Sequence, residues 1–195
     1  MTSVRRFLVV SNSMRTDGGF LLDDVPGTSG RADVIARSVV QAFLTSNGIR
    51  RDVLLHVVCT GPPDPPKALR FTGEDLRHLN PDERTTAALL QKALRAAADG
   101  LWRESTPGIH VRRVGLELVE EMDGPFIVLS EEAPPFRPEM AADEPTFVLG
   151  DHRGLTDAQA DLFRRKGAAA ASLGPVSLHT DQCIVVVHNL LDNAR

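Results

Sequence analysis

Residues 147–157 read FVLGDHRGLTD, and residues 169–192 read AAASLGPVSLHTDQCIVVVHNLLD. Each segment starts with a strand-like apolar run and then reaches a turn that contains glycine. A glycine at a strand end leaves backbone N–H and C=O groups free and allows a ligand to approach them closely. The two segments therefore predict a ligand pocket built from backbone loops in the last quarter of the sequence.

The sequence before and between these segments alternates predicted strands and helices. The hydrophobic pattern predicts strands at 7–11, 53–59, 67–71, 111–114, 126–130, 146–150 and 169–173. It predicts helices at 31–45, 82–98, 116–122, 158–166 and 180–191. We expect 67–71 to be an edge strand, and we expect Asn80 or a neighbour to cap the second helix, with Pro81 in its first turn. This order predicts one α/β domain spanning 1–195, with a mostly parallel sheet covered by helices on both faces.

Composition argues against several classes of protein. The formal net charge is −4, which argues against nucleic-acid binding driven by bulk charge but still allows a local basic patch. No apolar run approaches the roughly 20 residues of a membrane span, and the N-terminal segment does not resemble a signal peptide. The two cysteines make no disulfide framework, so we expect a cytoplasmic protein. No metal-binding motif is present, and we expect no metal site.

The predicted pocket does not match the standard nucleotide-binding motifs. Neither GxGxxG nor GxxxxGK[ST] follows the first predicted strand, so an ordinary Rossmann-type site has no support. Parallel sheets bind ligands at the carboxyl ends of their strands. Leu129, Gly150 and Leu173 lie at such ends, which places the pocket among the C-terminal loops. Taken alone, the pattern favours Gly150 and Gly174 as ordinary turn glycines over ligand-binding ones.

Six motifs follow one another along the chain. They are LDDVPGTSGRADVIAR (22–37), GIRRDV (48–53), GPPDPP (61–66), LRHLNPDERTTAALLQKAL (76–94), LGDHRG (149–154) and SLGPVSLHTDQCIVVVHNLLD (172–192). In this order they resemble the archaeal-type tRNA pseudouridine-54 N1-methyltransferase family of the SPOUT superfamily. The resemblance implies a C-terminal trefoil knot, S-adenosylmethionine as cofactor, a homodimer, and methyl transfer to N1 of a pseudouridine in tRNA. Segment 12–21 departs from the family pattern, which puts the choice of RNA in doubt.

The resemblance also implies which residues hold the cofactor. Backbone groups of three loops would bind the adenine edge, and apolar side chains would enclose its rings. We expect Cys183 to be a wall residue rather than a nucleophile, because no electropositive partner is evident. The residues implied are Leu129, Gly150, Leu173, Gly174, Pro175, Val176, Ser177, Leu178 and Cys183.

The final predicted helix is apolar nearly all round, which predicts burial. The implied knot would bury one side of it and a dimer partner the other. The alternative is a short strand at 184–187, because one isoleucine and three valines favour strand. We expect His188 to be a hydrogen-bonded core or interface histidine.

Arg31 and Asp33 are the candidate catalytic residues. In relatives of the superfamily, an Arg-x-Asp in this region resembles the pair on the substrate side. N1 of pseudouridine must lose a proton, which a carboxylate base or a polarising arginine can assist. The alternative is that Asp33 only favours the helix dipole and that Arg31 is solvated. Asp151 and His152 have no nucleophile placed for a triad, so we expect His152 to make loop hydrogen bonds.

Contact with RNA is expected from arginines, because phosphate groups are bound by clustered guanidinium groups. The candidates besides Arg31 are Arg37, Arg50 and Arg51. Two other functions stay open at this point. One is a methyltransferase for pseudouridine in ribosomal RNA, and the other is a non-catalytic RNA- or ligand-binding protein with the same fold.

Overall fold

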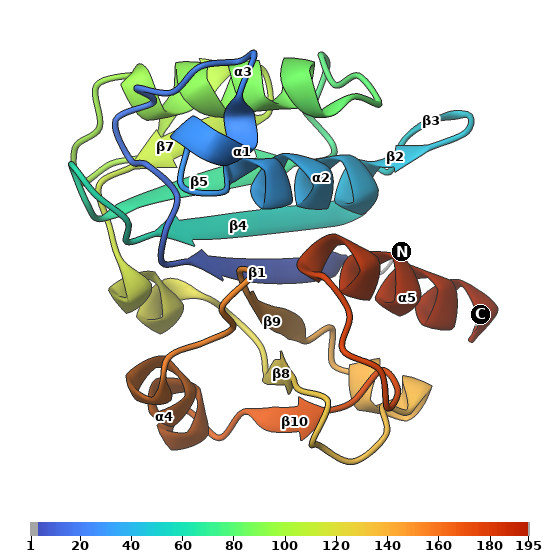
Figure 1. Ribbon diagram of the computed structural model, residues 1–195. Helices are drawn as coiled ribbons and strands as arrows, with labels where there is room; N and C mark the ends of the chain where they lie inside the picture. The colour runs from blue at the N-terminus through green and yellow to red at the C-terminus, as the bar shows by residue number, and fades with distance from the viewer. Residues whose placement is uncertain (1–3, 195) are drawn as a thin grey trace.

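The computed structural model describes residues 4–194 and is built on one eight-stranded sheet (Figure 1). The strand order is β10-β8-β9-β1-β4-β5-β7-β6. Neighbours from β10 to β4 are parallel, and those from β4 to β6 are antiparallel. The predicted mostly parallel α/β sheet is therefore confirmed. Its strands are β1 (Arg5–Ser11), β4 (Val53–Cys59), β5 (Lys67–Thr72), β6 (Arg103–Thr106), β7 (Ile109–Arg112), β8 (Phe126–Leu129), β9 (Thr146–Gly150) and β10 (Ala169–Ala171).

Successive side chains of a strand point to opposite faces of the sheet. Because apolar side chains stand on both faces here, helices cover both faces. Phe7 and Val9 of β1 join one apolar cluster with residues of α2, α3 and α5, while Leu8 joins a second with η1 and α4. Figure 1 shows α2 and α5 side by side over the sheet. The helices are α1 (Val25–Thr28), α2 (Ala32–Phe43), α3 (Glu83–Arg95), α4 (Asp157–Arg165), α5 (Thr180–Asn193) and the 3-10 helices η1 (Leu116–Glu121) and η2 (Pro138–Ala141).

One strand prediction and one helix boundary were wrong. β5 is not an edge strand, because it pairs with β4 on one side and β7 on the other. The edge is β6, whose sequence REST is polar and largely exposed, so it carries no hydrophobic pattern. The predicted helix at 31–45 ends early, because β2 (Leu44–Thr45) pairs with β3 (Gly48–Ile49) in a short hairpin.

The start of α3 also differs from the prediction. Asp82 is its N-cap and accepts a hydrogen bond from the Thr85 backbone N–H at 2.8 Å. Asn80 is therefore not the cap, and Pro81 lies outside the helix. An aspartate side chain reaches the free N–H groups of a first turn, which explains why the helix begins one residue later.

The last segment is a helix, α5, and the alternative of a strand at 184–187 was wrong. Its burial within this chain is one-sided. Ile184 and Val187 are buried, whereas Val185 is 44% exposed. The implied trefoil knot stays a prediction.

His188 anchors α5 to the sheet and to α2. Its Nδ1 accepts a hydrogen bond from Arg5 Nη1 at 3.0 Å, and its Nε2 lies 3.0 Å from the carbonyl oxygen of Ala42. Because a guanidinium only donates, these contacts fix the neutral imidazole with its proton on Nε2. Burial, assisted by the charges of Arg50 and Arg5, lowers the pKa of His188 to about 4. The predicted core histidine is confirmed.

This lowered pKa makes the stability of the protein depend on pH. The stabilising effect of neutral His188 is complete above an ordinary histidine pKa and is lost as the pH falls toward about 4. We expect the free energy of unfolding to fall by up to about 3 kcal/mol across this window. Urea unfolding at several pH values measures it. His188→Gln keeps an N–H donor but does not titrate, so an equally steep fall in that variant would assign the pH dependence to other groups.

Candidate functional site

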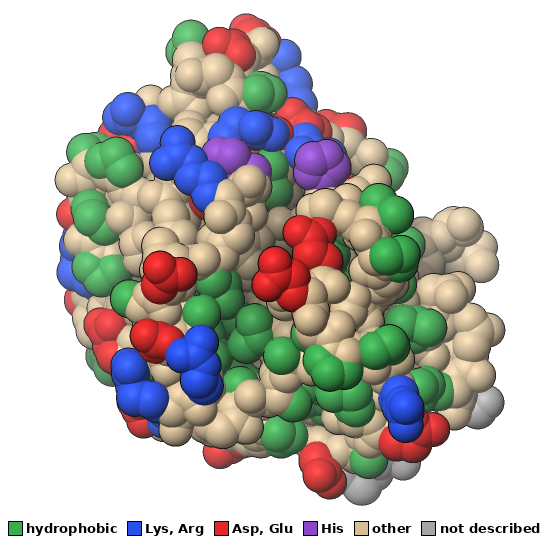
Figure 2. All heavy atoms as spheres, turned by 60° about the horizontal axis from the view of Figure 1, so that its bottom comes forward, with side chains coloured by type: hydrophobic (Ala, Val, Ile, Leu, Met, Phe, Trp, Pro, Cys, Tyr) green, Lys and Arg blue, Asp and Glu red, His purple; other side chains and the backbone are tan. Residues whose placement is uncertain are grey.

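A pocket of about 750 Å³ lies at the carboxyl ends of β8 and β9, where three loops meet the first turn of α5. Its volume is within the roughly 300–1,000 Å³ typical of small-molecule sites. Figure 2 shows this side of the molecule, with apolar side chains in the hollow and basic and histidine side chains gathered along one end of it. The pocket brings together all the predicted cofactor residues except Pro175. The predicted residues that line it are Leu129, Gly150, Leu173, Gly174, Val176, Ser177, Leu178 and Cys183.

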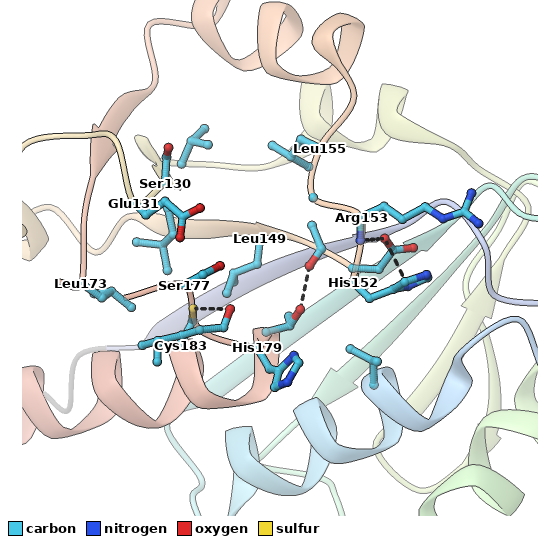
Figure 3. A pocket seen from close by; sticks show the side chains of 18 of the residues that line it. Ser130, Glu131, Leu149, His152, Arg153, Leu155, Leu173, Ser177, His179 and Cys183 are labelled. Atoms are coloured by element: carbon cyan, nitrogen blue, oxygen red, sulfur yellow. Dashed lines mark hydrogen bonds and ion pairs between the residues drawn. The ribbon is translucent and has the colours of Figure 1, made fainter. Parts of the chain in front are cut away.

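Charged side chains lie at two opposite ends of this pocket (Figure 3). Ser130 and Glu131 lie at one end, whereas His152 and Arg153 lie at the other. Leu149 lies between them. Ser177 also lies in this middle part, so the pocket suits a ligand that has polar groups at both ends.

The loop 172–178 provides free backbone groups. Ser172 Oγ donates to the carbonyl oxygen of Gly174 at 2.9 Å and accepts from its N–H at 3.1 Å, which holds the turn. Within residues 4–194, the backbone N–H groups of Val176, Ser177 and Leu178 donate no hydrogen bond. Unpaired N–H groups beside a pocket can bind the polar edge of a ligand.

Gly150 is required by a tight turn rather than by ligand approach. A Cβ at this position would lie 2.2 Å from the carbonyl carbon of Gly154. The Gly154 N–H donates to the Asp151 carbonyl oxygen at 2.9 Å and closes the turn. Thr180 Oγ1 donates to the Gly150 carbonyl oxygen at 2.8 Å. The turn after β9 therefore fixes the start of α5.

Cys183 has the properties of a wall residue. Burial raises the pKa of its thiol to about 11, and the charge of Asp181 adds to this. The thiol is therefore protonated at neutral pH and is a poor nucleophile. Residues 4–194 contain no group of three or more His, Cys, Asp or Glu side chains placed to hold a metal ion.

Arg31 and Asp33 form an ion pair with two hydrogen bonds. The pair lies beside the pocket, since the next residue in the sequence, Val34, is part of the pocket wall. Arg31 Nε and Nη2 donate to the two carboxylate oxygens of Asp33 at 2.9 and 3.1 Å. Arg31 is therefore not simply solvated. Its φ of 72° is left-handed, a conformation that costs a non-glycine residue about 1–2 kcal/mol. Such a cost is typical of residues that a functional site holds in place.

Arg37 joins this pair to two other helices. Its Nη1 donates to Asp33 at 3.0 Å and to Glu83 of α3 at 2.9 Å, and its Nε lies 3.7 Å from Asp181 of α5. Burial alone would raise the pKa of Asp33, but the hydrogen bonds from Arg31 and Arg37 outweigh it and the pKa is lowered. Because its pKa is lowered, Asp33 is a weak proton acceptor. Because it is only 2% exposed, it is also poorly accessible.

Arg50 and Arg51 make structural contacts and do not line the pocket. Arg50 Nη2 donates to Asp192 of α5 at 2.7 Å. Arg51 Nη1 donates to the carbonyl oxygens of Gly73 at 2.9 Å and Leu76 at 2.7 Å. Both arginines therefore have intramolecular partners, and RNA contact by them stays a prediction.

Asp151 has a larger part in the site than its place in the sequence indicates. This carboxylate is buried and accepts hydrogen bonds from Ser11 Oγ, the Asn12 and Arg153 N–H groups and Ser13 Oγ, at 2.8–3.3 Å. It ties the loop after β1 to the turn after β9. His152 Nδ1 lies 3.8 Å from its Oδ1. The only sequence signal was an acidic residue directly after a strand-ending glycine.

Comparison with known proteins gives a consistent result. Residues 4–195 match the family model described as SAM-dependent RNA methyltransferase. A Methanopyrus kandleri protein named tRNA (pseudouridine(54)-N(1))-methyltransferase is 45% identical over 98% of this chain and 94% of its own. A Methanosarcina mazei protein of the same name is 42% identical over 98% of this chain and 92% of its own. The crystal structure of Archaeoglobus fulgidus Nep1 bound to S-adenosylhomocysteine has the same fold, with a TM-score of 0.71 at 14% identity, covering 98% of this chain and 99% of that one.

Proposed function

Because the chain belongs to the SAM-dependent RNA methyltransferase family, we propose that it methylates N1 of the pseudouridine at position 54 of tRNA. The observation that carries this proposal is the sequence similarity, over nearly the full length of the chain, to relatives named for that reaction. The pocket adds support, because its loops offer the apolar walls and free N–H groups that a nucleoside cofactor needs.

S-adenosylmethionine, when bound, supplies an electrophilic methyl group. The wall side chains Leu129, Leu173 and Leu178 are suited to enclose an adenine ring, and the free N–H groups of the loop 172–178 to bind its polar edge. We propose that all nine residues predicted to bind the cofactor take part. Pro175 would act by stiffening the loop rather than by contact.

Arg31 is the residue best placed to assist the RNA base. Its guanidinium is fixed by Asp33, and its side chain is 40% exposed beside the pocket. A fixed guanidinium can hydrogen-bond to a carbonyl oxygen of the pyrimidine and stabilise the negative charge that appears when N1 loses its proton. In this proposal Asp33 orients Arg31 and is not itself the base.

Replacing Arg31 by alanine or glycine tests this role. Both variants remove the guanidinium, so we expect methylation to fall by about 100-fold or more with an unchanged Kd for S-adenosylmethionine. The two variants differ in backbone strain. Glycine relieves the left-handed conformation, so we expect Arg31→Gly to be about 1 kcal/mol more stable than Arg31→Ala. Single-turnover methylation and thermal unfolding measure the two effects, and wild-type turnover in both variants would exclude Arg31 from the reaction.

The proposal extends to assembly and location. We propose that a second copy of the chain covers the open side of α5, where Val185 is exposed. Action on tRNA would place the protein in the cytoplasm, and no helix within residues 4–194 is both long and apolar enough to cross a membrane. Arg37, Arg50 and Arg51 stay candidates for RNA contact, although each would have to give up an intramolecular partner.

Labelled S-adenosylmethionine tests the function directly. The protein is incubated with tRNA transcripts that carry either uridine or pseudouridine at position 54. We expect label transfer only to the pseudouridine transcript. Transfer to both transcripts would contradict the proposed substrate, and transfer to ribosomal RNA instead would favour the related ribosomal activity. No binding of the cofactor in calorimetry would exclude both activities.

A further inference from the structure

We propose that His152 is the catalytic base that accepts the N1 proton of pseudouridine, and that Asp151 is the positioning residue that holds it. The inference rests on the proposed function, because it concerns the proton that this reaction removes. The N1–H bond breaks, and the proton goes to an imidazole nitrogen. The N1 electron pair forms the new bond to the methyl carbon, and the electrons of the broken C–S bond stay on sulfur. The imidazolium then releases its proton to solvent.

Asp33 is poorly suited to this task. Both of its oxygens accept hydrogen bonds from Arg31, and Arg37 donates a third. Its side chain is 3% exposed, and it does not line the pocket. Proton transfer needs an acceptor within hydrogen-bond reach of the substrate. Asp33 therefore acts on the reaction only through its arginines.

The other acidic and sulfur-containing groups of the pocket are also poorly suited. Asp151 is buried and already accepts four hydrogen bonds. Glu131 lies at the opposite end of the pocket from His152 (Figure 3). Cys183 is held as a neutral thiol with a pKa of about 11 because it is buried. The imidazoles of His152 and His179 are left, and imidazole is the side chain suited to proton transfer near neutral pH.

The two histidines differ in whether a carboxylate lies close to the imidazole ring. His152 Nδ1 lies 3.8 Å from Asp151 Oδ1, whereas His179 has no ion-pair partner within residues 4–194. A carboxylate on one ring nitrogen fixes the tautomer and leaves the other nitrogen free to accept a proton. A separation of 3.8 Å is longer than a hydrogen bond, as is common before a substrate binds. Asp151 itself cannot move easily, because four donors hold it.

Arg31 lies on the same side of the site. The hydrogen bond to Asp33 is the largest cause that raises the pKa of Arg31, and the charge of Asp151 adds to it. The base and the proposed stabilising guanidinium are therefore both close to the carboxylate of Asp151. The charged or titratable groups that line the pocket together with His152 are Asp151, Arg153, His179, Cys183 and, at the far end, Glu131.

A matched pair of variants tests the proposal. His152→Gln and His179→Gln each replace one pocket imidazole by a group that does not titrate. We expect His152→Gln to lower the single-turnover rate on pseudouridine tRNA by about 100-fold or more, since general base catalysis contributes about 10²–10⁴-fold. We expect its Kd for S-adenosylmethionine to stay unchanged. His179→Gln should lower the rate far less than His152→Gln does.

Two further readouts separate catalysis from structure. Added imidazole should restore part of the rate of His152→Ala, and Asp151→Asn should lower the rate without changing which nitrogen of the RNA base is methylated. An active wild type together with an active His152→Gln would overturn this inference alone, whereas an inactive wild type would overturn the proposed function as well.

Discussion

The Gly150→Ala variant is expected to lose much of its affinity for S-adenosylmethionine while its sheet stays folded. The added Cβ would lie 2.2 Å from the carbonyl carbon and 2.5 Å from the Cα of Gly154. Backbone atoms cannot rotate away as a side chain does, so the turn must open. Inserting a methyl group into a well-packed site costs about 1–3 kcal/mol. If that cost falls on the binding conformation, the Kd rises by about tenfold to a hundredfold.

Two other glycines provide the controls for this result. A Cβ added at Gly100 would have no neighbouring atom within 4 Å, so Gly100→Ala adds the same methyl group without a clash. Gly154 also has open space but a φ of +74°, so Gly154→Ala tests backbone strain in the same turn without steric overlap. Calorimetric titration with the cofactor gives the Kd, and circular dichroism reports the fold. Wild-type affinity in Gly150→Ala would show that the turn does not shape the pocket.

Asp33→Asn is expected to have the second large effect, on turnover rather than on cofactor binding. The change keeps the shape of the side chain but removes the charge that Arg31 and Arg37 share. A misplacement of about 1 Å in a positioning group can cost about 100-fold in rate, and we expect a loss of that order. The Kd for S-adenosylmethionine should not change, since Asp33 does not line the pocket. Stability should fall by only about 1–2 kcal/mol, because both arginines are about a third or more exposed and solvent screens them.

The pH dependence of stability gives a second check on Asp33. Its pKa is lowered in the folded protein, so its stabilising effect is present above the ordinary carboxylate pKa and is lost as the pH falls through the folded value. This acidic part of the stability loss should be smaller in Asp33→Asn.

Glu83→Gln is the matched control, since it removes another carboxylate from Arg37 without touching Arg31. Equal loss of turnover in both variants would mean that charge around Arg37, rather than the orientation of Arg31, limits the reaction.

The pocket could be predicted from the sequence because its signals are local. Apolar runs that end in glycine-containing turns mark strand ends, and the carboxyl ends of parallel strands converge. The reason for Gly150 was not predictable in this way, because it depends on how closely the chain returns at Gly154. Neither was the role of Asp151, because its partners Ser11 and Ser13 lie about 140 residues away in the sequence.

The partners of charged residues could not be predicted from the sequence either. Arg37, Arg50 and Arg51 each look like a surface cation in the sequence. In the structure, Arg37 pairs with a glutamate 46 residues away, and Arg50 pairs with an aspartate 142 residues away. Hydrophobic periodicity carries no information about such pairs, because they depend on which elements pack together. Edge strand β6 was missed for a related reason, since its exposed polar residues show no alternation.

The contact between Arg5 and His188 joins residues 183 positions apart in the chain. During synthesis on a ribosome, β1 is made well before α5 and stays without this partner until α5 has emerged. Contacts of such long sequence separation form late and slowly. Because α5 also supplies the wall that includes Thr180 and Cys183, a nascent chain has no complete pocket at the ends of β8 and β9 before that helix docks. A nascent chain that still lacks α5 is therefore not expected to bind the methyl donor, so it should not compete for it with chains that have formed this helix.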